Sequence, residues 1–139
     1  MARMPVAVLL VVGLLFVPGT AAATPPSGVT GTIVAQKTVG GTDYVLRTIT
    51  ITPGGYTGWH PHDGPLFAYV RQGTLTRTLA DCTTTEVSPA GSTVVETPGT
   101  DHVHIGRNLG GVPVVLDVLY VLPAGSPLSE DAADPGCGI

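Results

Sequence analysis

The chain has 139 residues, a length that accommodates one domain and leaves no room for a second core. Six basic and ten acidic residues give a net charge of −4 at pH 7. The basic residues are scattered singly along the chain, so the sequence excludes the basic patch of a nucleic-acid-binding protein and disfavours an anionic membrane surface.

The first predicted element is a secretory signal peptide at residues 1–23. Arg3 supplies a basic start, residues 5–17 are an apolar run, and Ala21-Ala22-Ala23 offers a cleavage site. The alternative is a membrane anchor, but 13 apolar residues are fewer than the roughly 20 that span a bilayer. We therefore expect a secreted, extracytoplasmic protein that has no membrane contact after cleavage.

After this segment the pattern predicts short β-strands. Nineteen glycines and 13 prolines punctuate the chain, and Val, Ile and Thr dominate between them. The predicted strands lie at 29–37, 43–51, 56–62, 66–71, 74–79, 92–97, 102–107 and 112–122. The sequence thus predicts an all-β domain at 29–122, preceded by a flexible leader at 24–28 and followed by an extended tail at 123–139.

Cys82 and Cys137 are the two cysteines of the chain. In an oxidising compartment an even number of cysteines indicates a disulfide bond, here one that ties the tail to the barrel. The alternatives are two free thiols or a pair of metal ligands.

The histidines form a pattern that indicates metal binding. All four lie in two His-x-His units, His60-Pro61-His62 and His102-Val103-His104. Side chains two apart project from the same face of a strand, so each unit can direct two imidazoles at one point. Two alternatives remain: the histidines lie in surface turns, or only one unit binds metal.

The sequence around these histidines resembles the cupin family. Residues 53–62, with Gly73 downstream, resemble the first cupin motif, in which a glycine precedes His-x-His, a glutamate follows and a glycine closes the strand. Pro98-Gly99 and the residues from His104 to Asn108 resemble the second motif. The resemblance implies a single double-stranded β-helix barrel, as in small secreted one-domain cupins, with a metal held by His60, His62 and His104.

Two departures from the cupin pattern affect the predicted site. Leu66 stands where the first motif has its metal-binding glutamate, and His102 is an additional histidine. If the strand is regular, His102 shares a face with His104, and we expect it to fill the fourth position. A divalent transition metal (Zn, Fe, Mn, Cu or Ni) held only by neutral imidazoles keeps its full charge, which favours small anionic ligands.

Strand alternation assigns the remaining candidates. Tyr56 has the parity of the first histidine pair, so its hydroxyl either reaches the pocket beside Leu66 or packs in the core. Trp59 has the opposite parity, which indicates outer-face packing or a subunit contact. Phe67 and Tyr69 point away from the site and offer a face for a homodimer.

The other polar residues near the motifs receive structural roles. Glu96 is interpreted as a solvated strand residue. Asp63 and Asp101 are expected in turns, and Asn108 in a turn or against a ligand residue.

Two functions fit these features. The first is a metal-dependent protein that binds a small anionic organic ligand. The second is a metal-dependent enzyme, similar to cupin dioxygenases or isomerases, that acts on a small organic acid. Apart from the histidines, only Tyr56 and Glu96 could approach the pocket as an acid or base, so the binding protein is the preferred interpretation.

Overall fold

The computed structural model describes residues 22–139. The predicted signal peptide lies outside the described residues except for its last two positions. Within the described part, no helix is long and apolar enough to cross a membrane.

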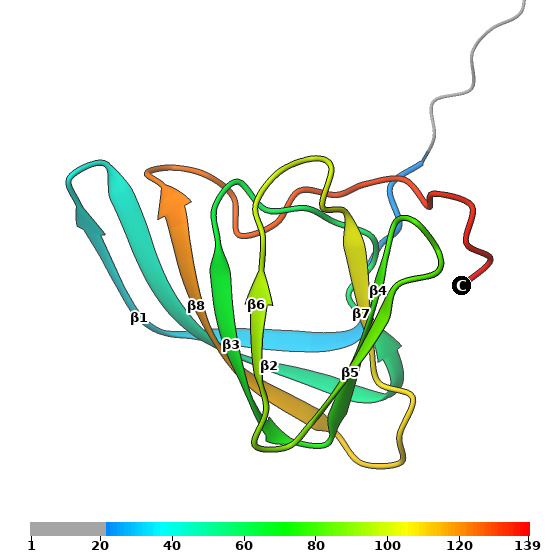
Figure 1. The fold of residues 1–139 in the computed structure, drawn as a ribbon. Coiled ribbons are helices and arrows are strands. Elements are labelled where there is room, and N and C mark those ends of the chain that lie inside the picture. Colours follow the sequence, from blue (N-terminus) through cyan, green and yellow to red (C-terminus); the bar gives the residue numbers. More distant parts are fainter. Residues whose placement is uncertain (1–21) are drawn as a thin grey trace, which may run out of the picture.

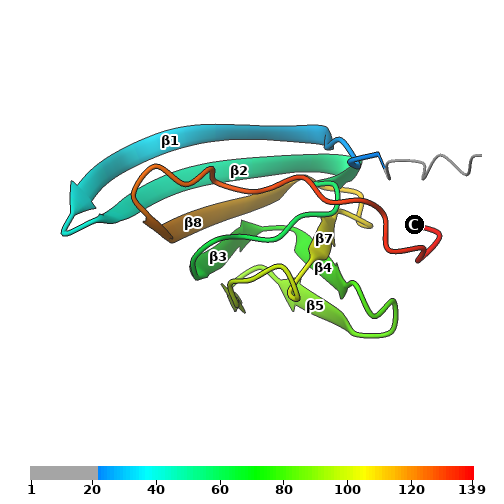
Figure 2. The ribbon, with the colours of Figure 1, turned by 90° about the horizontal axis from the view of Figure 1, so that it is seen from above.

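Residues 22–139 fold into strands, turns and loops, which confirms the all-β prediction (Figure 1). The strands are β1 (Ser27–Val39), β2 (Thr42–Tyr56), β3 (Leu66–Gln72), β4 (Thr74–Leu79), β5 (Thr85–Pro89), β6 (Thr93–Glu96), β7 (His104–Arg107) and β8 (Val114–Pro123). They pair antiparallel in the order β5-β4-β7-β2-β8-β3-β6, and β1 pairs with β2. The sheet curls into a nearly closed barrel, with β1 outermost beside β2 (Figure 2).

The hairpin of β1 and β2 follows directly from its turn residues. Val39 pairs with Thr42, and the two residues between them, Gly40 and Gly41, have φ angles of 55° and 79°. A two-residue turn of type I′ matches the twist of the strands and needs positive φ at both positions, which glycine adopts without steric cost.

The core follows the alternation of the strands. Val114, Leu116, Val118, Tyr120 and Leu122 of β8 are all buried, and their neighbours along the strand are more exposed. On β3, Leu66, Ala68 and Val70 point inward. The inward residues of β8 and β3 therefore form one apolar wall of the barrel.

The opposite face of this wall carries exposed apolar side chains. Phe67 and Tyr69 are nearly half exposed, as the strand parity predicts. The strand register places Leu46, Leu119, Phe67 and Val95 in one row across β2, β8, β3 and β6. Use of this face in a homodimer remains a prediction.

The predicted strand at 56–62 is wrong in one respect that affects the site. Strand β2 ends at Tyr56, and His60 makes only an isolated bridge to His104. Gly58 interrupts the strand with a φ of 75°, and a Cβ there would lie 2.0 Å from the backbone oxygen of Thr24. Because the chain turns at this glycine, strand parity does not carry over from Tyr56 to the histidines. The sequence also missed β5, a short and largely exposed strand.

The C-terminal tail crosses the loop that carries His60 and His62, and backbone hydrogen bonds hold it there. The backbone amides of Glu130 and Ala132 donate to the carbonyls of Pro61 and Trp59, at 3.2 and 2.9 Å. Trp59 is fully buried, which argues against the subunit contact. It belongs neither to the apolar core cluster nor to the residues around the histidine cavity, which agrees with packing away from the inner face. The predicted disulfide joins Cys82 and Cys137, so the end of the tail is fixed to the turn after β4.

The disulfide closes a loop between residues that are 55 apart. Replacing Cys82 and Cys137 together by serine restores the conformational freedom of the unfolded chain, so we expect the free energy of unfolding to fall by about 3–4 kcal/mol. Chemical denaturation monitored by Trp59 fluorescence measures this change. An unchanged denaturation midpoint would show that the disulfide does not stabilise the fold.

Candidate metal centre

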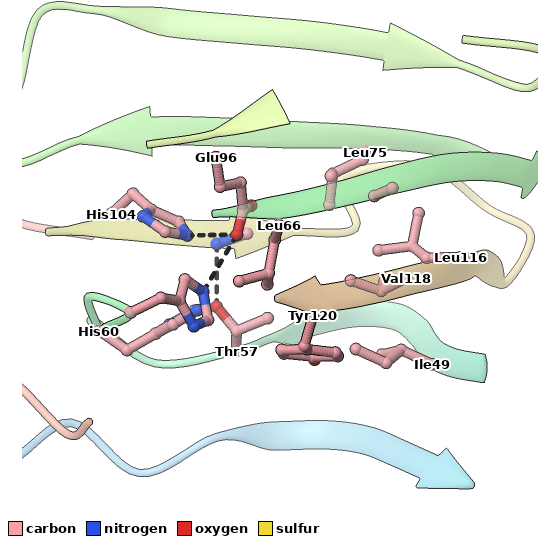
Figure 3. Close-up of a pocket in the computed structure, with 13 residues that line it drawn as sticks. Ile49, Thr57, His60, Leu66, Leu75, Glu96, His104, Leu116, Val118 and Tyr120 are labelled. Carbon is pink, nitrogen blue, oxygen red and sulfur yellow. Dashed lines mark hydrogen bonds and ion pairs between the residues drawn. The ribbon is translucent and has the colours of Figure 1, made fainter. Parts of the chain in front are cut away.

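Four side chains from three parts of the chain converge inside the barrel. They are His60, His62, Glu96 and His104, and their ligand atoms lie within 4.8 Å of one another. Figure 3 shows His60, Glu96 and His104 pointing toward one another at one end of the cavity. Three imidazoles and one carboxylate are a donor set that suits a divalent transition metal.

Backbone pairing brings the two histidine units together. The amide of His60 donates to the carbonyl of His104 at 2.9 Å, and the amide of His104 donates back at 3.1 Å. This two-way bridge places the loop after β2 directly beside the start of β7. Segments far apart in the sequence therefore present their imidazoles to a common point.

The carboxylate comes from the strand next to the position where the first motif has its glutamate. Leu66 occupies that position on β3, and its register partner on β6 is Glu96. The side chain of Glu96 is only 14% exposed, and its Oε2 lies 3.0 Å from Nε2 of His62 and 3.2 Å from Nε2 of His104. The interpretation of Glu96 as a solvated residue is thus wrong, and an acidic side chain reaches the site from another strand.

Each of the three imidazoles is oriented by a hydrogen bond from its Nδ1 to a backbone carbonyl. His60 donates to Gly58 at 2.9 Å, His62 to Leu128 at 2.7 Å and His104 to His102 at 2.9 Å. A carbonyl oxygen only accepts, so Nδ1 carries the hydrogen and Nε2 of a neutral ring presents a lone pair. This pattern is typical of histidines that bind a metal through Nε2.

The donor atoms of this group are arranged as a bound cation requires. The Nε2 atoms of His62 and His104 are buried and have no hydrogen-bond partner, yet both face the same carboxylate oxygen. Lone pairs in this arrangement repel one another unless a proton or a cation lies between them. The residues therefore fit a divalent ion, and Glu96 lowers the net charge of such a centre from +2 to +1.

In the metal-free protein the charges of the three histidines and of Glu96 shift the pKa values of Glu96, His104 and His60. Burial raises the pKa of Glu96, but the attraction of the facing imidazoles of His104 and His62 outweighs burial and holds this pKa well below its ordinary value. Burial lowers the pKa of His104, but the contact with Glu96 outweighs it and the net shift is upward. For His60, burial and the charges of the other two histidines lower the pKa to about 4.

His102, the expected fourth ligand, lies outside this group. It precedes β7 and donates its backbone amide to Gly99 in a turn, so the alternation of a regular strand does not apply to it. Its side chain is 43% exposed, and its Nε2 lies 3.7 Å from Asp101. The expectation of an all-histidine centre is corrected accordingly: the fourth member of the group is Glu96.

A cavity of about 50 Å³ adjoins the four residues. Leu66 lines it, as expected, but Tyr56 does not, because the turn at Gly58 separates Tyr56 from the histidines. Its walls are largely apolar: Ile49, Leu66, Ala68, Leu75, Leu116 and Val118, with Thr57, Gly106 and Tyr120 completing the lining (Figure 3).

Sequence reasoning missed Tyr120, although a signal was present. Tyr120 has the same parity on β8 as the buried Val118 and Leu116. Its ring lies with its centroid 6.0 Å from that of His62. Burial raises the pKa of Tyr120, so its phenol keeps its proton at neutral pH.

The low pKa of His60 predicts a pH dependence of stability in the metal-free protein. Between pH 6.5 and about 4 the unfolded chain takes up a proton that folded His60 does not, so the free energy of unfolding falls as the pH decreases through this range. We expect His60 to account for a loss on the order of 2 kcal/mol. Urea denaturation of chelator-treated protein from pH 7.5 to 4.5 measures it. The His60→Gln variant serves as the control and should show a shallower slope, whereas equal slopes would contradict the prediction.

Three comparisons place this architecture among known proteins. The family model described as "Cupin domain" matches residues 47–122, and no curated protein matches. A similar solved structure is the polyketide cyclase RemF from Streptomyces resistomycificus, with 19% identity, coverage of 92% of this chain and 90% of that chain, and a TM-score of 0.60.

Two further structures share the fold. An uncharacterised conserved protein with a double-stranded β-helix domain from Klebsiella pneumoniae is 21% identical over 78% of this chain and 84% of its own, with a TM-score of 0.59. KdgF from a Halomonas species is 22% identical over 72% and 79%, with a TM-score of 0.54. The family match covers more than half of the chain, from β2 to β8, and contains His60, His62, Glu96 and His104; the chain belongs to the cupin family.

Proposed function

We propose that this cupin is a metal-dependent binding protein for a small organic anion. The observation that carries the proposal is the convergence of three Nε2 lone pairs and one carboxylate oxygen, next to an apolar cavity. His60, His62, His104 and Glu96 hold the metal. Once bound, the metal supplies a positive centre that attracts an anionic donor group.

The size and the lining of the cavity limit which ligands can bind. A volume of about 50 Å³ holds only a few water-sized groups, so one small end of a ligand enters. A carboxylate or enolate oxygen faces the metal, and a short aliphatic part packs on Leu66, Ala68 and Val118. Besides the four metal-holding residues, the polar side chains that line the cavity are Thr57 and Tyr120, and neither is charged at neutral pH. The positive charge of the metal centre therefore dominates the electrostatics of the cavity.

We also propose that the protein acts outside the cytoplasm. The support is the predicted signal peptide at residues 1–23 together with the disulfide between Cys82 and Cys137, a bond that persists in oxidising compartments.

Metal content distinguishes ligands from bystanders. We expect one divalent ion per chain in untagged protein and a loss of at least tenfold in metal affinity for His60→Ala, His104→Ala and Glu96→Gln, because each removes a donor atom. His102→Ala is the matched control and should bind metal like the unchanged protein. Elemental analysis and competition with a chromophoric chelator provide the measurement. A variant of His102 that loses metal as His104→Ala does would refute the assignment.

Ligand selectivity tests the cavity. The metal-loaded protein should bind butyrate about tenfold more tightly than acetate, since each further buried methylene contributes about 0.8 kcal/mol. Ala68→Leu narrows the cavity and should abolish this preference without loss of metal, as judged by calorimetric titration. Ala35→Leu makes the same change on the exposed strand β1 and is the control. Equal affinities for acetate and butyrate in the unchanged protein would argue against an apolar ligand part.

One observation favours the alternative, a metal-dependent enzyme that acts on a small organic acid. The phenol of Tyr120, protonated at neutral pH, lines the cavity beside His62 and could donate a proton to a bound enolate or carboxylate. A Tyr120→Phe variant that retains ligand affinity but loses turnover of that ligand would support this function over simple binding.

A further inference from the structure

Arg77 is an arginine almost completely withdrawn from solvent. It lies on β4 and is 8% exposed. Its cross-strand partner on β5 is Glu86, whose Oε2 accepts from Nε at 3.0 Å and from Nη2 at 2.5 Å. The guanidinium is therefore fixed in place on the β4–β5 side of the barrel.

This guanidinium bridges the open seam of the barrel, which is the gap between the two edge strands, β5 and β6. The strand order runs from β5 to β6, and the structure records no strand pairing between these two ends over residues 22–139. From β4, Nη2 of Arg77 donates to the carbonyl of Val95 at 3.4 Å, and Nη1 lies 3.6 Å from Oε1 of Glu96. Arg77 thus connects the β4–β5 edge to the last residues of β6.

The two oxygens of Glu96 consequently face different groups. Oε2 faces His62 and His104 at 3.0 and 3.2 Å, and Oε1 faces Arg77. A carboxylate held in this way offers one oxygen to a metal and keeps the other occupied. Since β6 has only four residues and pairs with β3 alone, its own ladder gives the end of the strand little restraint.

We propose that Arg77 is a positioning residue for the metal centre: anchored by Glu86, it holds Oε1 of Glu96 so that Oε2 alone points at the ion. The inference rests on the proposed metal binding by the four-residue group. It also explains why an arginine occupies this place, because its planar fork contacts both carboxylates and the Val95 carbonyl at once, which a lysine ammonium does not.

A purely structural role for Arg77 makes a different prediction. If Arg77 only closed the seam of the barrel, its removal would weaken the metal centre whether or not residue 96 is a ligand. If Arg77 acts through Glu96, its removal has no further effect once Glu96 is gone. A double-mutant cycle separates the two.

The experiment measures Zn²⁺ affinity by chelator competition in the full chain and in Arg77→Gln, Arg77→Lys, Glu96→Gln and the double variant Arg77→Gln/Glu96→Gln. We expect Arg77→Gln to weaken binding by 10- to 100-fold, Arg77→Lys to recover part of that loss, and the double variant to match Glu96→Gln alone. The visible spectrum of the Co²⁺-loaded protein should change in Arg77→Gln, because the orientation of one ligand is released. Arg71→Gln removes an exposed arginine that pairs with Asp117 at 3.4 Å and is the control, with affinity unchanged.

The outcomes are distinct. Tight Zn²⁺ binding by the unchanged protein together with equally tight binding by Arg77→Gln would overturn this inference and leave the proposed function standing. Additive losses in the double variant would likewise overturn it, in favour of a structural role. An unchanged protein that binds neither Zn²⁺ nor Co²⁺ would overturn both proposals.

Discussion

The arrangement of this molecule depends on one electrostatic constraint: buried lone pairs of His62 and His104 face a buried carboxylate oxygen about 3 Å away. Such an arrangement is costly in an apolar interior unless positive charge lies among the donors. In the metal-free protein a proton on an imidazole supplies such a charge, in agreement with the lowered pKa of Glu96 and the raised pKa of His104. A divalent ion satisfies the same constraint with more donors.

Much of the barrel serves to maintain this arrangement. The backbone bridge between His60 and His104 sets the distance between the two histidine units. The tail supplies the carbonyl of Leu128 that orients His62, and the disulfide at Cys137 fixes the end of that tail. The C-terminal segment therefore helps to orient a residue of the four-residue group, although it lies beyond the region that the family match covers.

The charge of the centre differs from that of an all-histidine site. With Glu96 as a ligand, the group contributes one negative charge, and the nearby guanidinium of Arg77 offsets part of it while being shared with Glu86. With a divalent ion bound, the proposed centre keeps a net charge of +1. The attraction for anions that the sequence predicted is therefore still expected, although it is weaker than that of an all-histidine centre. The largely apolar walls then favour anions with a short aliphatic part, and the hydroxyl groups of Thr57 and Tyr120 offer few hydrogen bonds to a polar tail.

The sequence by itself determined the fold class, the disulfide and the three histidines that the structure brings together. The fold class and the disulfide follow from local chemistry, namely the glycine and proline spacing and the even cysteine count. The three histidines follow from the two His-x-His units together with the resemblance of the surrounding sequence to the cupin motifs. Only the tertiary structure decided the fourth member of the group. Glu96 is 34 residues beyond His62, and nothing in its local sequence shows that β6 pairs with β3 so that this carboxylate faces the cavity. His102 and Tyr56 were misplaced for a related reason: strand parity holds only within a regular strand, and turns beside each of them break it.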